Sequence, residues 1–208
     1  MKLAVVILNW NGATLLEAYL PKVLAFTPDA DIYVIDNAST DHSVSTLTSS
    51  FPEVTVIQNK ENYGFAGGYN KGLEEIEADV FCLLNSDVEV TPNWTGPVLE
   101  LFGTDENVGI AQPKILNLNK RTHFEYAGAG GGFLDRFGYP FCRGRIFQAI
   151  EEDTGQYDDI KEVFWATGAC LFIRKTLFWD LQGFDNTYFA HQEEIDLCWR
   201  AKNRGNKI

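Results

Sequence analysis

Three polar residues whose side chains could bind a ligand, Asn85-Ser86-Asp87, directly follow the apolar run 81–84. The run is typical of a buried strand, and because polar and apolar residues alternate over 88–90, we expect this strand to surface and continue to Val90. In an extended chain, Asn85 and Asp87 point to one face and Ser86 to the other. Two oxygen ligands on one face can hold a divalent cation, which takes its remaining ligands from water and substrate phosphates. This arrangement predicts a metal and diphosphate site.

A plain turn is the competing interpretation of the same three residues. Asn, Ser and Asp often hydrogen-bond their own backbone after a strand, and a three-residue motif is weak by itself. Locally the turn is the commoner meaning, so the rest of the chain has to decide between the two.

A second chemical candidate is the pair Glu193-Glu194, which lies where a helix is expected to begin. Asp196 and Arg200 would form an ion pair one turn apart, so part of this helix is structural. The helix dipole tolerates carboxylates in its first turn, and one of them could serve as a general base that faces the sheet. Two solvated first-turn acids are an equally good interpretation of the local sequence.

The chain predicts an α/β fold that would position these candidates. Strands are expected where β-branched and aliphatic residues cluster, at 3–8, 32–35, 54–57, 81–90, 108–111, 163–165 and 169–173. Helices are expected at 15–24, after a cap at Ser39 or Thr40, up to 73–76, at 93–102 and from 193. The order strand, helix, strand, helix, strand over the first sixty residues favours a parallel sheet with right-handed crossovers. Polar clusters follow the strands, at the edge where open α/β sheets bind ligands.

Two further segments have a composition that points to function. Residues 62–72 are rich in glycine and lead into a helix, so their backbone could approach an anion closely, although a turn without a ligand fits equally well. Residues 117–157 have little periodicity and too many aromatic residues for disorder, so we interpret them as a folded excursion on the substrate side. Its aromatic residues could stack on sugars or pack in a core, and they are Phe124, Tyr126, Phe133, Phe137, Tyr139 and Phe141.

Composition argues against several classes of protein. With a net charge of -12, the 208-residue chain would repel nucleic acid, so no nucleic-acid partner is expected. The four cysteines form no Cys-x-x-Cys pair, which favours buried free thiols. No signal peptide or membrane-spanning stretch is recognisable, so we expect a soluble cytoplasmic protein. The dinucleotide fingerprint and the P-loop motif are both missing, which argues against a Rossmann dehydrogenase and a P-loop NTPase.

Several motifs follow one another along nearly the whole chain. They are Val6-Ile7-Leu8-Asn9-Trp10-Asn11, then 34–41, 62–70, Leu84-Asn85-Ser86-Asp87, 167–170, Gly183-Phe184-Asp185 and 193–200. In this order they resemble the motifs of family 2 glycosyltransferases, most of all the bacterial branch with rhamnosyl- and galactofuranosyl-type transferases.

This resemblance implies a GT-A fold, which is a Rossmann-like, mostly parallel sheet flanked by helices, with a smaller mixed part on the acceptor side. It implies one domain, 1–208, with a nucleotide-sugar-binding half at 1–112 and an acceptor-side half at 113–208. The implied activity is inverting transfer of a sugar from a dTDP-, UDP- or GDP-linked donor to a glycan or lipid-linked acceptor in cell-surface polysaccharide synthesis, with Mg2+ or Mn2+ as cofactor. It leaves room for peripheral association with the inner face of the membrane and for a homo-oligomer.

By position, the resemblance also assigns roles to individual residues. Asp87 and Asn85 match the metal motif, and Glu194 matches the general base. The acceptor and sugar pocket would comprise Trp165, Thr167, Gly168 and Glu193. The donor site would comprise Leu8, Asn9, Trp10, Asp36, Asn37, Asn62, Gly64, Gly67, Asn70 and Ser86.

The sequence departs from the family pattern in three places. Asn85 stands where the family usually has Asp, and Glu194 stands where it usually has Asp as the base. The sequence ends at Ile208, where many relatives continue with a segment that often carries a metal-binding His. A nucleotide-sugar-binding module without catalysis and a sugar nucleotidyltransferase are the alternatives. The latter would need an arginine-containing loop after the first strand, and residues 9–12 contain no arginine.

Overall fold

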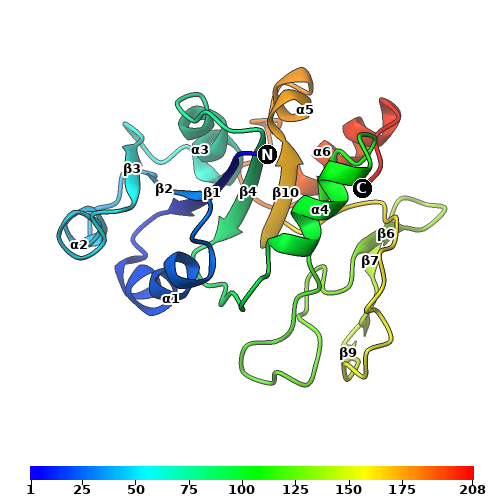
Figure 1. Ribbon diagram of the computed structural model, residues 1–208. Helices are drawn as coiled ribbons and strands as arrows, with labels where there is room; N and C mark the ends of the chain where they lie inside the picture. Colours follow the sequence, from blue (N-terminus) through cyan, green and yellow to red (C-terminus); the bar gives the residue numbers. More distant parts are fainter.

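The computed structural model describes residues 1–208 and contains a six-stranded sheet with helices on both faces (Figure 1). In sheet order the strands are β3 (Thr55–Gln58), β2 (Asp31–Asp36), β1 (Leu3–Asn9), β4 (Val80–Asn85), β10 (Cys170–Arg174) and β5 (Ile110–Ala111). The first four are parallel to one another, and β10 runs antiparallel to both β4 and β5. The predicted parallel β-α-β-α-β order of the first sixty residues is therefore confirmed.

Six helices cover the two faces of this sheet. They are α1 (Ala13–Phe26), α2 (Ser43–Ser50), α3 (Gly64–Leu73), α4 (Gly96–Thr104), α5 (Lys175–Asp180) and α6 (Glu193–Asn203). Ala4 and Val6 of β1 pack in the core under α3, α5 and α6, whereas Val5 and Ile7 pack in the core under α1, α2 and α4. Because both faces are covered, β1 reads as an unbroken apolar run instead of an alternating one.

The glycine-rich segment differs from the prediction because it is the helix itself, not a turn that precedes it. Helix α3 begins at Gly64, and a Cβ atom at Gly72 would lie 2.3 Å from the Ile35 side chain of β2. A Cβ atom at Gly68 would lie 2.9 Å from the Leu8 side chain of β1. These glycines therefore let α3 pack closely against the sheet.

Two expectations about element ends are wrong. The strand that begins at Val80 ends at Asn85 and does not continue to Val90, because the chain turns at Ser86 and the Val88 N–H donates to the Asn85 carbonyl at 3.3 Å. Helix α2 is not capped by Ser39 or Thr40. It begins at Ser43, where the Asp41 carboxylate accepts from the Ser43 N–H at 2.9 Å.

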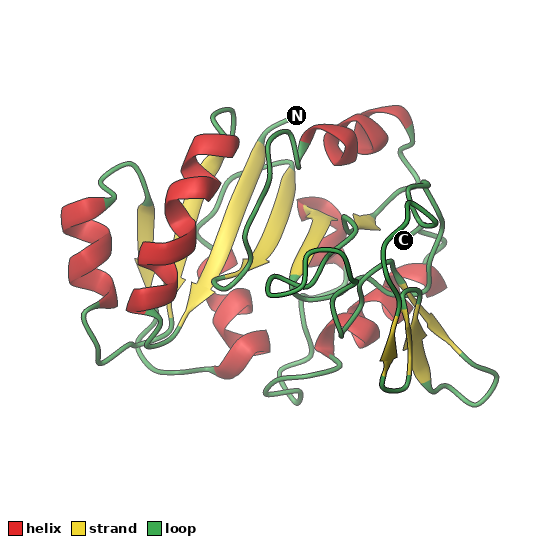
Figure 2. Ribbon diagram, turned by 90° about the horizontal axis from the view of Figure 1, so that it is seen from below, coloured by secondary structure: helices red, strands yellow, loops and turns green.

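The excursion predicted at 117–157 is folded and contains a second, small antiparallel sheet. Its strands are β6 (Gly132–Leu134), β7 (Pro140–Cys142), β8 (Arg145–Ile146) and β9 (Ala149–Ile150), which pair in chain order. The small sheet lies to one side of the large one (Figure 2). Residues 163–165, which we expected to form a strand, make only an isolated bridge from Trp165 to Gly132 that ties the small sheet to the body.

The four cysteines are all free and buried, as expected. No helix is both long enough and apolar enough to cross a bilayer.

Candidate functional site

The carboxyl ends of the central strands lie side by side and bring the first group of candidate residues together. In the sheet register Asn9 pairs with Asp36, and Leu8 pairs with Asn85. The Asn85 N–H donates to the Ala169 carbonyl at 3.0 Å, so the segment before β10 borders the same edge. This is the edge where an open α/β sheet binds ligands.

The side chains after β1 and β2 are bound mainly to one another. Asp36 is buried, and its carboxylate accepts from the Asn9 side-chain amide at 3.0 Å and from the Ser39 N–H at 2.9 Å. The Asn11 side-chain oxygen accepts from the Thr40 N–H at 2.7 Å. These bonds join the two turns into one rigid unit, which sequence reasoning did not foresee.

Asn37 is the centre of a second set of bonds. Its amide donates to the Asn62 side-chain oxygen at 2.8 Å and to the Gly64 carbonyl at 2.9 Å, and its own oxygen accepts from the Asn59 amide at 3.0 Å. The N–H of Gly64 in turn donates to the Asn62 side chain at 2.9 Å. This N–H is therefore not free for an anion, and the contacts favour the structural interpretation of the glycine-rich segment.

Most of the remaining donor candidates hold α3 in place, and one of them is exposed. Asn70 donates to the Phe184 carbonyl at 2.8 Å and accepts from the Phe184 N–H at 2.9 Å, which fastens α3 to the turn before α6. Gly67 packs against the Tyr63 side chain and Leu8 against Gly68. Trp10, by contrast, is 58% exposed at the end of β1, where its ring is free to contact a ligand.

The residues at the end of β4 have no such partners. None of the hydrogen bonds or ion pairs of the chain includes the side chains of Asn85, Ser86 or Asp87, and Asp87 is exposed. No three His, Cys, Asp or Glu side chains gather anywhere as a metal cage. One amide and one carboxylate oxygen nevertheless fit the pattern of Mg2+ and Mn2+ sites that take their other ligands from phosphates and water. Asn85 and Asp87 thus suit a metal that arrives with a diphosphate.

The acidic pair at the start of α6 is sheltered from water, so the solvated interpretation is wrong. Glu193 is 4% exposed, and its Oε2 atom is buried without a hydrogen-bond partner. Burial, reinforced by the negative charge of Glu193, raises the pKa of Glu194 to about 7. Both preceding residues, His191 and Gln192, have positive φ angles of 74° and 70°. Such strain in residues other than glycine is concentrated at functional sites.

A short segment, residues 166–169, connects α6 with the end of β4. The Ala166 N–H donates to the Cys198 Sγ atom of α6 at 3.4 Å, and the Ala169 carbonyl accepts from Asn85. Thr167 donates through its hydroxyl to the Ala127 carbonyl at 2.9 Å. The role of Cys198 as an anchor was missed because a cysteine inside an apolar helix face carries no signal of its partner.

The other two residues predicted for the acceptor and sugar pocket, Trp165 and Gly168, differ in how closely their neighbours surround them. The Trp165 ring is buried, stacks over Gly132 and donates from Nε1 to the Phe133 carbonyl at 3.0 Å. Gly168 is more open, because a Cβ atom there would approach only the Phe65 ring, at 3.5 Å. The open part of this region is therefore Gly168, whereas Trp165 is bound to the small sheet.

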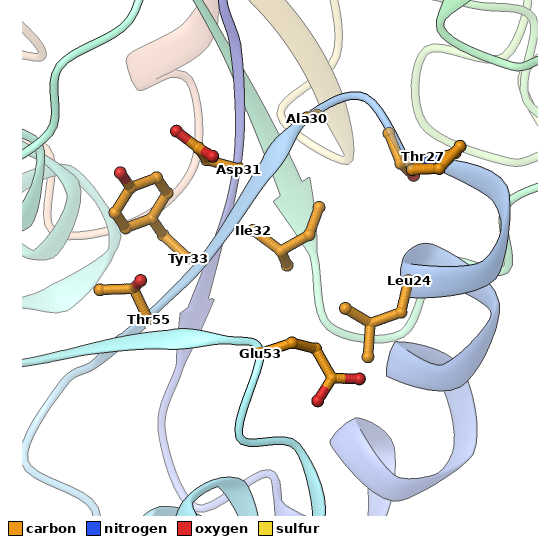
Figure 3. A pocket seen from close by; sticks show the side chains of 9 residues that line it. Leu24, Thr27, Ala30, Asp31, Ile32, Tyr33, Glu53 and Thr55 are labelled. Carbon is orange, nitrogen blue, oxygen red and sulfur yellow. The ribbon is translucent and has the colours of Figure 1, made fainter.

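A hollow of about 390 Å³ lies away from all of these residues (Figure 3). It is lined by residues at the amino ends of β2 and β3, among them Asp31, Tyr33 and Glu53, and by the end of α1. Asp31 is already paired with Lys2 at 2.9 Å. Because open α/β sheets bind ligands at the opposite edge, we place the site at the carboxyl ends of the strands.

The fold is the GT-A fold. The structure matches a mannosyltransferase from Pyrobaculum calidifontis in complex with GDP-Man and Mn2+, with a TM-score of 0.70 and 16% identity over 99% of this chain and 53% of that one. It also matches GalNAc-T7 with UDP, GalNAc and Mn2+, with a TM-score of 0.75 and 18% identity over 100% of this chain and 41% of that one.

A profile of glycosyl transferase family 2 matches residues 4–182, and the chain belongs to this family. It is 24% identical to a low-salt glycan biosynthesis hexosyltransferase of Haloferax volcanii over 99% of this chain and 63% of the relative. It is 23% identical to an N-acetylglucosaminyl-diphospho-decaprenol L-rhamnosyltransferase of Mycobacterium tuberculosis over 98% of this chain and 71% of the relative. The chain thus spans about two thirds of the length of these relatives. The predicted family, fold and enzyme class are confirmed.

Proposed function

We propose that this glycosyltransferase transfers a sugar, with inversion at the anomeric carbon, from a nucleotide-diphospho-sugar to an acceptor hydroxyl. The observation that carries the proposal concerns the Glu194 carboxyl group. Burial raises its pKa to about 7. A general base works best when its pKa lies near the operating pH, and an ordinary exposed glutamate would be too weak a base.

In the proposed reaction Glu194 accepts the proton of the acceptor hydroxyl as the hydroxyl oxygen attacks the anomeric carbon. The bond from that carbon to the donor diphosphate breaks, and the nucleoside diphosphate leaves with the bonding electron pair. A single displacement of this kind inverts the anomeric configuration. The Cys198 contact to Ala166 and the Ala169 contact to Asn85 support the idea that the base and the diphosphate site face one substrate.

Asn85 and Asp87 are the proposed ligands of a divalent metal, Mg2+ or Mn2+, on the diphosphate. Such an ion, when bound, neutralises the charge that develops on the leaving phosphate. The unpaired state of both side chains supports this role, as do the Mn2+ ions in the two related complexes. Ser86 lies between them in the sequence, and we propose that its hydroxyl also contacts the diphosphate.

The nucleotide would occupy the ends of β1 and β2, next to Trp10, with Asp36 and Asn37 holding the shape of the pocket from inside. The donor contains a single nucleoside, so the site has to bind only one base. The exposed Trp10 ring and the rigid turns after β1 and β2 are sufficient for this. The acceptor would enter between Gly168 and the first turn of α6, where the buried Oε2 atom of Glu193 has no partner within the chain. The neighbours in complex with GDP-Man and with UDP and GalNAc make GDP- and UDP-linked donors candidates, and dTDP-linked donors are the third class to test. The relative named for N-acetylglucosaminyl-diphospho-decaprenol makes lipid-linked acceptors candidates beside glycans.

A thermal-shift screen tests the donor site. We expect one of UDP, dTDP, GDP or their sugars to raise the melting temperature in the presence of Mn2+, because a ligand that binds only the folded state stabilises it. The metal-dependent part of the shift should disappear in Asp87→Ala and persist in Asp29→Ala, an exposed aspartate at the opposite edge of the sheet. A shift that survives in Asp87→Ala would remove this residue from the donor site.

The product of the identified donor tests the reaction itself. An anomeric configuration opposite to that of the donor, determined by NMR, is expected for direct displacement. Retention would overturn the proposed mechanism. Binding of the donor without transfer or hydrolysis would leave a nucleotide-sugar-binding module.

A further inference from the structure

The small sheet ends in two turns that expose large apolar side chains. Strands β6, β7, β8 and β9 pair antiparallel in chain order, so β6 and β8 run in the same direction. The turn after β6 and the turn after β8 therefore lie at the same end of the sheet. We call them the tip turns, residues 135–139 and 147–148. They stand away from the large sheet (Figure 2).

The second tip turn contains a residue that folding alone does not explain. Phe147 occupies a tight hairpin turn with a φ angle of 52°, a conformation that favours glycine or asparagine. Its ring is also 87% exposed, and the neighbouring Ile146 is 68% exposed. A phenylalanine here costs free energy in the backbone and again in hydration, so its benefit has to come from a contact outside the chain.

The first tip turn repeats this composition. Phe137 and Tyr139 are each 70% exposed, and the Asp135 carboxylate holds the turn by accepting from both of their N–H groups, at 2.8 and 2.9 Å. A rigid turn with two outward aromatic rings presents a defined surface. Two such turns at one end of a sheet form an apolar patch of the kind that marks an interaction site.

The charge at the tip turns differs from that of the chain as a whole. Residues 132–150 carry three arginines and a single acidic residue, although the net charge of the chain is -12. Arg136 and Arg145 have no acidic partner and stack instead on Phe137 and Tyr126, at 4.5 and 3.8 Å from the ring centroids. The third arginine, Arg143, is paired with Asp159. Within the tip turns, Arg136 thus places a cation without an acidic partner beside the aromatic rings, whereas Arg145 lies in β8 and its Nη1 atom is buried.

We propose that the tip turns dock the protein on the surface of a lipid bilayer that contains anionic lipids. The Phe137 and Phe147 side chains, with Ile146 of β8 beside Phe147, enter the boundary between headgroups and acyl chains. The Tyr139 ring lies at the interface, and Arg136 contacts lipid phosphates. The small sheet is joined to the proposed acceptor segment through the Gly132 bridge to Trp165, and the chain just before the sheet is joined to it through the bond from Thr167 to Ala127. Docking therefore sets the acceptor side of the enzyme next to the bilayer.

Flotation with vesicles tests this proposal without any donor or acceptor. Wild type should float with phosphatidylcholine vesicles that contain about a third phosphatidylglycerol, more weakly with pure phosphatidylcholine, and less in high salt. Phe147→Asn should reduce partitioning about tenfold, since most of the transfer free energy of one phenylalanine is lost. Asparagine accepts the positive φ angle, so this variant should fold and melt at or above the temperature of wild type.

Two further variants separate the contributions and control for surface hydrophobicity. Arg136→Gln should reduce binding about fivefold on the anionic vesicles alone, as expected for one lost cation. Leu15→Ser, which removes a partly exposed apolar side chain on α1, should float like wild type.

Wild type that stays in solution with anionic vesicles would overturn the proposal, and so would a Phe147→Asn variant that floats as well as wild type. Concentration-dependent dimers that Phe147→Asn abolishes, without vesicle binding, would instead assign the patch to a second copy of the chain. Failure of the vesicle test leaves the thermal-shift result for the donor unaffected, so the two proposals fail separately.

Discussion

The polar clusters at the carboxyl edge of the large sheet differ in what their side chains bind. After β1 and β2, residues such as Asp36 and Asn37 are buried and bonded to neighbouring turns. After β4, Asn85 and Asp87 have no partner in the chain. Because an isolated polar group next to an ordered turn contributes little to folding, the second cluster is the one available for a ligand.

The acidic side chains at the start of α6 resemble the second cluster because they also lack partners, but they are less exposed to water. Glu193 and Glu194 are sheltered from water, yet neither forms an ion pair. Burying carboxylates without partners destabilises a protein, and we propose that catalysis is the reason for their position. The comparison assigns the first cluster to architecture and the other two groups to chemistry, and variants can test this division.

The largest effect is expected at Glu194. Glu194→Gln removes the proposed base and should lower kcat by about 100- to 10,000-fold, with the donor thermal shift unchanged. Glu194→Asp should retain part of the rate, because the carboxylate is kept but set back by one methylene. Glu106→Gln, on the exposed surface, serves as the control in the same steady-state assay. Equal rates for Glu194→Gln and the control would remove Glu194 from the reaction.

The next effect separates architecture from chemistry directly. Asn37→Ala should lower the free energy of unfolding by about 3 kcal/mol, because it leaves several buried groups without partners. Asp87→Ala should change it by less than about 0.5 kcal/mol, since no internal contact is lost. Denaturant titration measures both. A large loss of stability in Asp87→Ala would show that the two clusters do not differ as described.

A third effect follows from the pKa of Glu194, which burial raises to about 7 in the folded protein from its ordinary value of 4.5. The folded state holds this proton more tightly than the unfolded state, so the associated stability is present below about pH 4.5 and is lost as the pH rises to about 7. Glu194→Gln should therefore be more stable than wild type at pH 8, by about 2 to 3 kcal/mol, and nearly equal to it at pH 4.5. Melting curves at both pH values measure this, and a gain that is independent of pH would contradict it.

The same pKa predicts the pH dependence of the rate. A base must be deprotonated to act, so kcat should rise with pH and level off above about pH 7. The rising limb should move to lower pH in Glu193→Gln, because removing the negative charge of Glu193 lowers the pKa of Glu194. An unchanged limb in Glu193→Gln would assign it to another group.

The smallest effect concerns the boundary between the two clusters. Glu89, just after the free residues of the β4 turn, pairs with Lys22 at 2.6 Å and with Arg121 at 2.7 Å, and these ion pairs lower its pKa. Both cations are largely exposed, so Glu89→Gln should cost only about 0.5 to 1 kcal/mol, and less in high salt. If Glu89 holds the turn that carries Asp87, Glu89→Gln should also weaken the metal-dependent affinity for the donor by a few fold. Unchanged binding would make the pairs a matter of stability alone.

Local pattern was enough to predict most of the large sheet. The apolar runs at 3–8 and 32–35 and the helical spacing between them became β1, β2 and α1 with small shifts at the ends. The strand expected to reach Val90 ended at Asn85, because the alternation in 88–90 has the period of a strand but comes from a turn and its ion pairs. Helix α5 was not foreseen, since six residues show too little periodicity for a helix.

The family and the GT-A fold followed from motifs and their order, which the sequence contains in full. The bonding of those motifs did not, because hydrogen bonds such as Asn37 to Gly64 or Cys198 to Ala166 join residues that only the folded chain brings together. The glycine-rich segment shows the limit of sequence reasoning, because its composition fits both a loop and a close-packed helix. In the folded chain its glycines contact the side chains of Leu8 and Ile35, and the segment is a helix.

By itself, the sequence determined which residues could do chemistry, since carboxylates, amides and their order are properties of the chain. Tertiary structure decided which of them remain available, because availability depends on burial and on neighbours that lie far away in the sequence. Asp36 and Asp87 are the same kind of residue after neighbouring strands, and only the folded protein bonds the first and leaves the second free.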